Sequence, residues 1–215
     1  MLDFGIAAGL FVAAFALGSI PWGVIVSRVF YHTDIRSHGS GNIGTTNAMR
    51  TMGKVGGGAV FLLDFGKGIA SGLLGLALSA FLSGAVSQAT LLGVATMGCT
   101  LGHIFSPWLG FRGGKGIAVA IGALFVCWGP AAACIELFGI FTVLVLLTRY
   151  VSAGSVASAA LCPVIAAFLF WGDWAAILCY LVTGATVVWA HRGNIERLLA
   201  GNERRVGAKK QAEGN

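Results

Sequence analysis

Long apolar stretches separated by short polar segments run through the whole chain. Most of the stretches reach or exceed the roughly 20 residues that an α-helix needs to cross the hydrocarbon core of a bilayer. Six of them follow one another: Phe4–Val29, Val55–Leu82, Val86–Phe105, Ile117–Leu147, Val151–Trp171 and Trp174–Ala190. This pattern predicts an all-α integral membrane protein.

The stretch Ile117–Leu147 decides how many times the chain crosses the membrane. It is too long for one ordinary span and short for two, but Gly129-Pro130 near its middle favours a tight turn. With a turn there the chain has seven transmembrane helices. With a single span, the basic C-terminal segment would move to the other side of the membrane.

The distribution of basic residues favours seven helices. In that arrangement all lysines and arginines except Lys67 lie at one face, in or close to residues 31–54, 106–116 and 191–215 and at Arg149. The opposite loops, near Ser83–Ala85, Gly129-Pro130 and Gly172-Asp173, contain none. Because basic loops stay in the cytoplasm, we expect the N-terminus outside and the C-terminus inside. We expect one transmembrane catalytic domain, 1–201, and a polar basic cytoplasmic tail, 202–215.

Composition supports the membrane assignment and excludes other classes. Hydrophobic residues make up 57% of the 215 residues and charged residues 10%, against about 25% charged in soluble domains. The net charge of +6 comes from residues that flank apolar spans, so it indicates orientation and not nucleic-acid binding. The five cysteines lie in apolar stretches without CxxC spacing, and the four histidines are dispersed. We therefore expect no disulfide, no metal and no cofactor.

Small and charged residues inside the spans suggest how the helices pack. The pairs Gly5/Gly9, Gly68/Gly72 and Gly98/Gly102 have the four-residue spacing that lets transmembrane helices approach closely. Asp64 and Lys67, three residues apart, are expected to pair on one helix face. Glu136 has no partner that the sequence reveals.

Three polar, glycine-rich segments interrupt the apolar pattern, and each combines a cation with hydroxyl, amide or backbone donors. They are Gly39–Arg50, Phe111–Gly116 and His191–Leu198. Glycines let backbone N–H groups converge on an anion, and the second segment leads directly into a helix N-terminus. It is not a P-loop, because Gly116 stands where Ser or Thr would bind magnesium. The segments predict a site for phosphate-bearing substrates.

These segments resemble one family of enzymes over most of the chain. The motifs are Gly39-Ser40-Gly41-Asn42-x-Gly44-x-Thr46-Asn47-x-x-Arg50, Gly102-His103-x-Phe105 through Phe111-x-Gly113-Gly114-Lys115-Gly116, and His191-Arg192-x-Asn194-Ile195-x-Arg197-Leu198-x-x-Gly201-x-Glu203. They look like those of the bacterial acyl-phosphate-dependent glycerol-3-phosphate acyltransferases, as does Leu63-Asp64-x-x-Lys67-Gly68. One departure is Ile43, where many members have proline.

The resemblance implies transfer of a fatty acyl group from acyl phosphate to the 1-hydroxyl of glycerol 3-phosphate. The products would be lysophosphatidic acid and phosphate, formed at the cytoplasmic face of the bacterial inner membrane. The catalytic residues would be Ser40, Arg50, Lys115, His191 and Asn194. The substrate-binding residues would be Gly41, Asn42, Gly44, Thr46, Asn47, Gly113, Gly114, Gly116 and Arg192.

Two questions stay open at this point. The first is the base that takes the hydroxyl proton. It is either His191 or the phosphate of the donor, and the sequence shows no acidic partner near His191.

The second is the functional class, because two other classes of membrane protein compete with this interpretation. A CDP-alcohol phosphotransferase would need an aspartate-rich metal motif, which the sequence lacks. An anion transporter that works by alternating access would be expected to show an inverted repeat, and none is visible.

Overall fold

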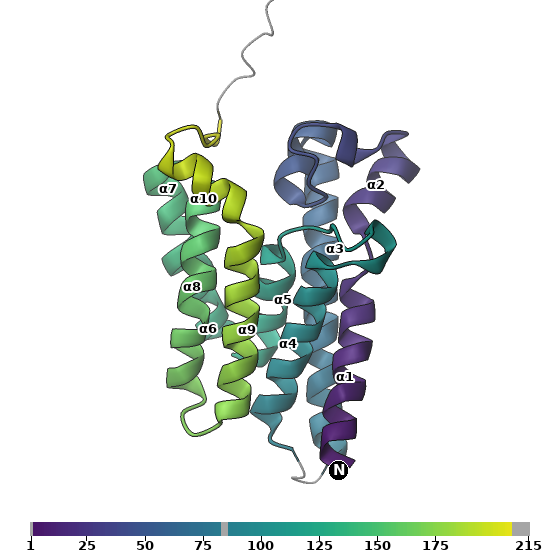
Figure 1. Cartoon of the computed structure of the whole chain (residues 1–215), viewed down its shortest axis with the longest axis vertical. Coiled ribbons are helices and arrows are strands. Elements are labelled where there is room, and N and C mark those ends of the chain that lie inside the picture. Colours follow the sequence, from purple (N-terminus) through teal and green to yellow (C-terminus); the bar gives the residue numbers. More distant parts are fainter. Residues whose placement is uncertain (1, 83–85, 208–215) are drawn as a thin grey trace, which may run out of the picture.

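The structure is a computed structural model, and it describes residues 2–82 and 86–207. Every regular element in these residues is a helix, which confirms the predicted all-α class. The elements, several of which run along the long axis of the molecule (Figure 1), are α1 (Leu2–Gly18), α2 (Trp22–Tyr31), η1 (Ile35–Ser37), α3 (Thr45–Phe81), α4 (Gln88–Ile104), η2 (Pro107–Leu109), α5 (Ile117–Cys127), α6 (Pro130–Cys134), η3 (Ile135–Thr142), α7 (Val143–Thr148), α8 (Val151–Leu169), α9 (Trp174–Ala190) and α10 (Arg192–Leu199). The predicted loop at Ser83–Ala85 and residues 208–215 of the predicted tail lie outside the described residues.

Five helical stretches of the described chain are long and apolar enough to cross a membrane. They are Phe4–Tyr31, Thr45–Phe81, Gln88–Leu109, Pro130–Thr148 and Val151–Leu169. A sixth is present if α9 and α10, which are bent by 56° relative to each other, count as one span. The apolar helix α5 has 11 residues, fewer than the roughly 20 needed to cross alone. The protein is therefore multi-pass, and the count of seven stays a prediction.

The chain interrupts its helices at proline and glycine, partly where expected. Gly129 has φ +80° and Pro130 opens α6, so the chain does break at the predicted position. The predicted first span is divided into α1 and α2 just before and after Pro21, which has no N–H to donate. The element α3 begins at Thr45, so half of the first polar segment is helical, but Gly53 (φ 72°, ψ −172°) kinks it. The long part of α3 follows Gly53, close to the predicted start at Val55.

The segment η3 (Ile135–Thr142) is a π-helix, which nothing in the sequence predicted. Within it, the Thr142 hydroxyl donates to the carbonyl of Leu137, five residues earlier, at 2.7 Å. π-Helical turns are rare and are frequent at functional sites. Glu136, in the first turn of η3, is buried, and none of the described residues gives its Oε2 atom a hydrogen-bond partner.

Close packing between helices depends on glycine, as two of the three small-residue pairs predicted. A Cβ atom at Gly102 would lie 2.1 Å from the Phe15 carbonyl oxygen, so α1 and α4 touch through their backbones. A Cβ at Gly68 would lie 2.1 Å from the Val119 carbonyl oxygen, so α3 and α5 do the same. The pair Gly5/Gly9 is different, because an added Cβ would meet no described atom within 4 Å.

The predicted pair of Asp64 and Lys67 is present and buried. The two side chains are 3.0 Å apart, and the Lys67 ammonium also donates to the carbonyls of Gly18 (2.8 Å) and Ile20 (2.9 Å). Ser106 donates its hydroxyl to the carbonyl between them, that of Ser19, at 2.7 Å. The break between α1 and α2 exposes these carbonyls inside an apolar bundle, and side chains from elsewhere in the chain satisfy all three.

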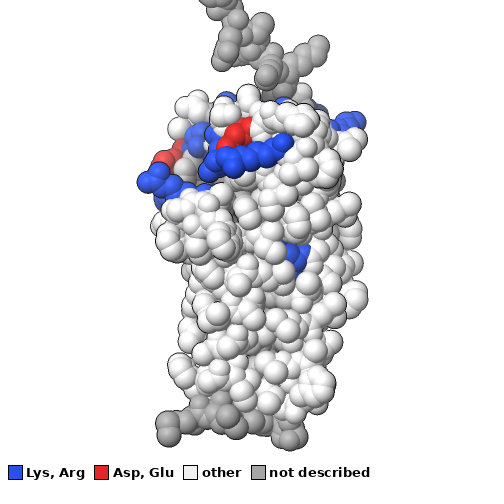
Figure 2. All heavy atoms as spheres, turned by 90° about the vertical axis from the view of Figure 1, so that its right-hand side faces the viewer, with Lys and Arg blue, Asp and Glu red and all other residues white. Residues whose placement is uncertain are grey.

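Charged side chains gather at one end of the molecule. Figure 2 shows lysine, arginine and acidic side chains concentrated near that end of the face in view, with uncharged atoms over most of the rest. In Figure 1 the same end contains the α2–α3 connection and α10, whereas the N-terminus and the turn between α8 and α9 lie at the opposite end. The α4–α5 connection lies on the charged half, below the other two segments. The three polar segments therefore share one half of the bundle.

Candidate active site

A cavity of about 770 Å³ lies among the three polar segments. Its polar lining includes, from the predicted residues, Ser40, Asn42, Gly44, Thr46, Asn47, Arg50, Lys115, Gly116, His191, Arg192 and Asn194. Gly41, Gly113 and Gly114 do not line it, so their predicted contact with substrates stays untested. Its apolar lining includes Phe61, Ile121, Leu137 and Phe141. The cavity thus joins a cationic region to an apolar one.

The first polar segment is folded around Asn47, which is 2% exposed. The Asn47 amide nitrogen lies within 3.1 Å of the carbonyls of Ile35, His38 and Asn42, and its Oδ1 accepts from the Ser40 N–H. These contacts use both N–H groups of the amide inside the loop. Asn47 therefore shapes the loop, and its predicted contact with a substrate stays a prediction.

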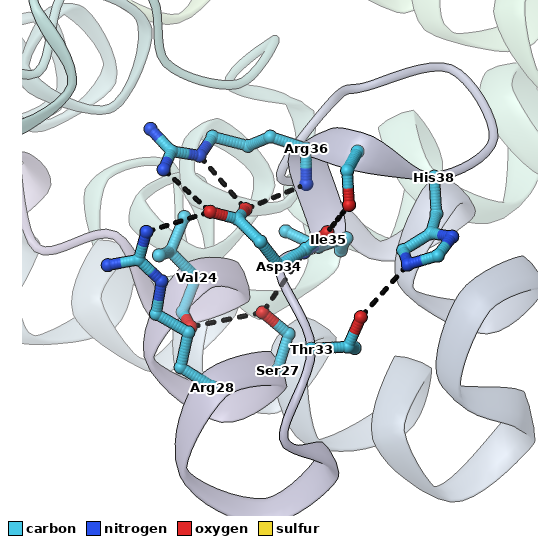
Figure 3. Close-up of polar contacts among 9 residues, drawn as sticks. Val24, Ser27, Arg28, Thr33, Asp34, Ile35, Arg36 and His38 are labelled. Carbon is cyan, nitrogen blue, oxygen red and sulfur yellow. Dashed lines mark hydrogen bonds and ion pairs between the residues drawn. The ribbon is translucent and has the colours of Figure 1, made fainter.

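A second cluster holds the beginning of this loop to α2 (Figure 3). The Asp34 carboxylate accepts from Arg36 at 2.7 Å and from Arg28 at 2.8 Å, and the Arg36 bond is the main reason why the pKa of Asp34 lies well below its usual range. Ser27 accepts from the Ile35 N–H at 3.3 Å. None of these residues lines the cavity, so the cluster supports the loop from outside.

The second polar segment places Lys115 at the N-terminal end of α5. Gly116, with φ +87°, forms the N-cap, and the helix begins at Ile117 as predicted. The Lys115 ammonium donates to Oδ1 of Asn194. Burial, together with Arg197 and Arg50 and against the opposing effect of Glu203, lowers the pKa of Lys115 to about 8. Lys115 is therefore a cation whose charge depends on pH near neutrality.

The third segment places His191 at the bend between α9 and α10. Its Nδ1 lies 2.8 Å from the Val187 carbonyl oxygen. A carbonyl can only accept, so Nδ1 carries the hydrogen and Nε2 of the neutral ring is the nitrogen with a free lone pair. The ring is 3% exposed and lines the cavity.

Glu203 completes the polar network, and no role was predicted for it. Its Oε1 accepts from Asn194 Nδ2 and its Oε2 from Arg197 Nε, each at 2.8 Å. Burial raises the pKa of Glu203, but these bonds outweigh that effect and the pKa lies below its ordinary value. The carboxylate orients the Asn194 amide so that its oxygen meets Lys115. The only signal in the sequence was its place at the end of the third motif.

Several further residues line the cavity without having been predicted as site residues. The polar ones are Thr45, Asp64, His103, Ser152, Ser155, Glu196, Arg197, Glu203 and Arg204. Arg192 was predicted, and its guanidinium lies 4.1 Å from the centre of the Trp189 ring. Among the residues that the structure describes, no three His, Cys, Asp or Glu side chains form a group that could hold a metal ion.

Comparison with known proteins identifies the family. The model of a family described as glycerol-3-phosphate acyltransferase matches residues 8–201. The chain belongs to this family. A glycerol-3-phosphate acyltransferase of Rhodopseudomonas palustris (strain BisB5) is 41% identical, with 94% of this chain and 99% of the relative covered. One of Thermosynechococcus vestitus is 39% identical, with 93% and 94% covered.

Solved structures agree with the family assignment. A crystal structure of PlsY, an integral membrane glycerol 3-phosphate acyltransferase, in its glycerol 3-phosphate form superposes with a TM-score of 0.81 at 34% identity and covers 94% of this chain and 96% of its own. The lysophosphatidic acid form has a TM-score of 0.78 at 33% identity, with 94% and 95% covered. This family member is therefore a multi-pass bacterial membrane protein.

The pKa of Lys115 leads to a prediction for anion binding. Between pH 7.5 and 9.5 a phosphate monoester stays a dianion, because its second pKa is about 6, while free Lys115 loses its charge as the pH rises through about 8. We expect the affinity for glycerol 3-phosphate, measured by calorimetry in detergent, to fall over this range. In Lys115→Arg, whose guanidinium stays charged, we expect the affinity to stay nearly constant. An equally steep fall in both proteins would contradict the assignment.

Proposed function

We propose that this family member transfers a fatty acyl group from acyl phosphate to the 1-hydroxyl of glycerol 3-phosphate. The products are lysophosphatidic acid and inorganic phosphate. The observation that carries the proposal is the single cavity, in which a cationic, donor-rich region is continuous with an apolar one. The similar solved structures, named for glycerol 3-phosphate and lysophosphatidic acid, support the acceptor and the product.

The polar region suits two phosphate groups. Its lining includes more basic than acidic side chains, so its net charge is positive. The basic side chains include Arg50, Lys115, Arg197 and Arg204, and the acidic ones include Glu196 and Glu203. The N-terminus of α3 opens on the same space at Thr45 and Thr46 and adds backbone N–H groups and the positive end of a helix dipole. In this proposal Ser40, Arg50 and Lys115 hold and neutralise phosphate, while Asn42, Thr46 and Asn194 position the substrates.

The apolar region suits the acyl chain of the donor. Phe61 of α3 and Ile121 of α5 contribute to it from one side, and Leu137 and Phe141 of η3 from the other. A fatty chain bound there stays in an environment as apolar as the bilayer from which it comes. Only the phosphate end of such a donor would need to enter the polar region.

The chemistry is direct acyl transfer. The glycerol hydroxyl oxygen forms a bond to the acyl carbonyl carbon, the bond from that carbon to the phosphate oxygen breaks, and phosphate leaves. Acyl phosphate is a mixed anhydride that is already activated, so the protein need not supply a covalent nucleophile. Its contribution is to hold the two substrates in reacting geometry and to stabilise the negative charge that develops on the carbonyl oxygen.

The proton of the hydroxyl goes to the phosphate of the donor in this proposal, and His191 orients the acceptor. The His191 ring donates from Nδ1 to a neutral carbonyl, and among the described residues no carboxylate forms an ion pair with it that would stabilise an imidazolium. Lys115, a cation in the same cavity, further disfavours a second positive charge on the ring. The ring's Nε2 is suited to accept a hydrogen bond from a substrate hydroxyl.

We also propose seven transmembrane helices, with the N-terminus outside and the C-terminus in the cytoplasm of a bacterial cell. The catalytic domain is 1–201 and the tail 202–215 remains cytoplasmic. The concentration of charged side chains at one end of the bundle supports this orientation. The break at Gly129-Pro130 supports pairing α5 with the helix that follows. The cavity then opens to the cytoplasmic side of the inner membrane.

The donor is tested with purified protein, glycerol 3-phosphate and either palmitoyl phosphate or palmitoyl-CoA. We expect lysophosphatidate and phosphate from acyl phosphate alone, with a loss of roughly 100-fold or more in kcat/KM for Lys115→Ala and for Arg50→Ala. Lys54→Ala, an exposed lysine outside the cavity, is the control and should stay near wild type. Product from the thioester alone would overturn the donor. Uptake of glycerol 3-phosphate into proteoliposomes without acyl product would favour a transporter.

The proton acceptor is tested with His191→Gln, in which a side-chain amide replaces the ring. We expect kcat to fall by about 10- to 100-fold, because orientation is impaired and the donor phosphate still takes the proton. His38→Gln, an exposed histidine that does not line the cavity, is the control. A fall beyond about 1,000-fold with unchanged substrate affinity would instead assign the general base to His191.

Orientation is tested with two cysteine variants, Asn202→Cys beyond α10 and Trp171→Cys at the turn between α8 and α9. In intact spheroplasts we expect a membrane-impermeant maleimide to label Cys introduced at 171 and not at 202. Inside-out vesicles should give the reverse pattern. The parent protein gives the background, since its five free cysteines are buried or half-buried. Labelling of both positions from one side would contradict the arrangement.

A further inference from the structure

His103, near the end of α4, lies between the buried Lys67 ammonium and the loop that carries Lys115. Its Nδ1 is 2.9 Å from Lys67 Nζ. An ammonium only donates, so Nδ1 accepts this hydrogen bond and Nε2 carries the ring hydrogen. The ring is 4% exposed and has a fixed partner on one side.

The other side of the ring is fitted against Gly114. A Cβ atom at Gly114 would lie 2.0 Å from His103 Nε2, closer than any real contact. The backbone is joined at the same place, because the Gly114 N–H donates to the His103 carbonyl at 3.1 Å and the Gly113 N–H to the Ile104 carbonyl at 2.9 Å. The loop is thus seated on α4 one residue before Lys115.

We propose that His103 is a positioning residue for Lys115. Its ring, held by Lys67, fixes the position and orientation of the loop Gly113–Gly116, so that the Lys115 ammonium can contact Asn194 in the cavity. The role of Lys115 in phosphate binding comes from the proposed function, and the inference rests on it in that respect only.

The ring is the rigid partner in this contact. Lys67, which holds Nδ1, is itself bonded to the carbonyls of Gly18 and Ile20 and paired with Asp64. Moving the ring would therefore disturb four buried polar contacts, whereas the loop has only two backbone bonds to α4. A side chain added at Gly114 is expected to displace the loop, and Lys115 with it.

The test combines Gly114→Ala with His103→Asn. An asparagine side chain can keep an acceptor for Lys67 near the place of Nδ1 but has no atom in the place of Nε2, so it frees the space that the new methyl group needs. Gly113→Ala is the matched control. Its Cβ would lie 2.0 Å from the backbone oxygen of His103, which remains in every variant.

Two readouts are compared. The first is modification of Lys115 by an amine-reactive reagent, measured by mass spectrometry on folded protein, which does not depend on any enzymatic activity. The second is kcat/KM for acyl transfer. In Gly114→Ala we expect Lys115 modification to increase, and kcat/KM to fall, by about tenfold or more. In Gly114→Ala/His103→Asn we expect both values to return to within about threefold of His103→Asn alone.

Gly113→Ala should be equally impaired with and without His103→Asn. The inference is overturned if the effects of Gly114→Ala and His103→Asn simply multiply, or if Gly114→Ala leaves the modification of Lys115 unchanged. If Gly114→Ala does not fold, recovery of a monodisperse protein in the double variant but not in Gly113→Ala/His103→Asn supports the contact, and failure in both overturns it. If the wild type transfers no acyl group from either donor, the proposed function fails, while the modification of Lys115 still decides the role of His103.

Discussion

The arrangement of the bundle depends most on the contacts that the Lys67 ammonium makes. It lies inside an apolar bundle, where a lone charge is costly, and at the break between α1 and α2 it donates to the carbonyl of Gly18 and adds a second donor to that of Ile20. Breaking such a buried pair by removing one partner typically costs about 3–5 kcal/mol. Lys67 and its partner Asp64 belong to α3, and the ammonium contacts α4 through His103, so one charge joins three helices, α1, α3 and α4, and the α1–α2 connection.

The cavity has two regions because the chain delivers polar groups and apolar groups from different directions. The polar groups come from connections at the charged half of the bundle, where water can solvate backbone that is not helical. The apolar groups come from side chains on α3, α5 and η3. This division matches the needs of any reaction that joins a water-soluble phosphate ester to a lipid chain, and it requires neither a second domain nor a covalent intermediate.

Sequence reasoning was accurate where a local rule applied and failed where tertiary contacts decided. The interruption at Gly129-Pro130 and the start of α5 after Gly116 follow from backbone chemistry that a few residues determine. The pairing of Asp64 with Lys67 follows from helical spacing. The use of the Asn47 amide inside its own loop could not be read from spacing, because three of its partners become neighbours only when the loop closes. Glu203 reaches Asn194 for the same reason, because the turn after α10 at Gly201 brings its side chain back to that helix.

The π-helix η3 has a consequence for insertions and deletions in this protein. Each residue of an α-helix advances the chain by about 100° around the axis, and a π-helical segment accommodates one residue more than an α-helix of the same length. A chain shortened by one residue here would still form a continuous helix between α6 and α7. It would, however, turn one half of that helix relative to the other, so that the buried direction of Glu136 and the cavity-facing directions of Leu137 and Phe141 could not all be kept. The length of this span is therefore constrained by the shape of the cavity and not only by the thickness of the membrane.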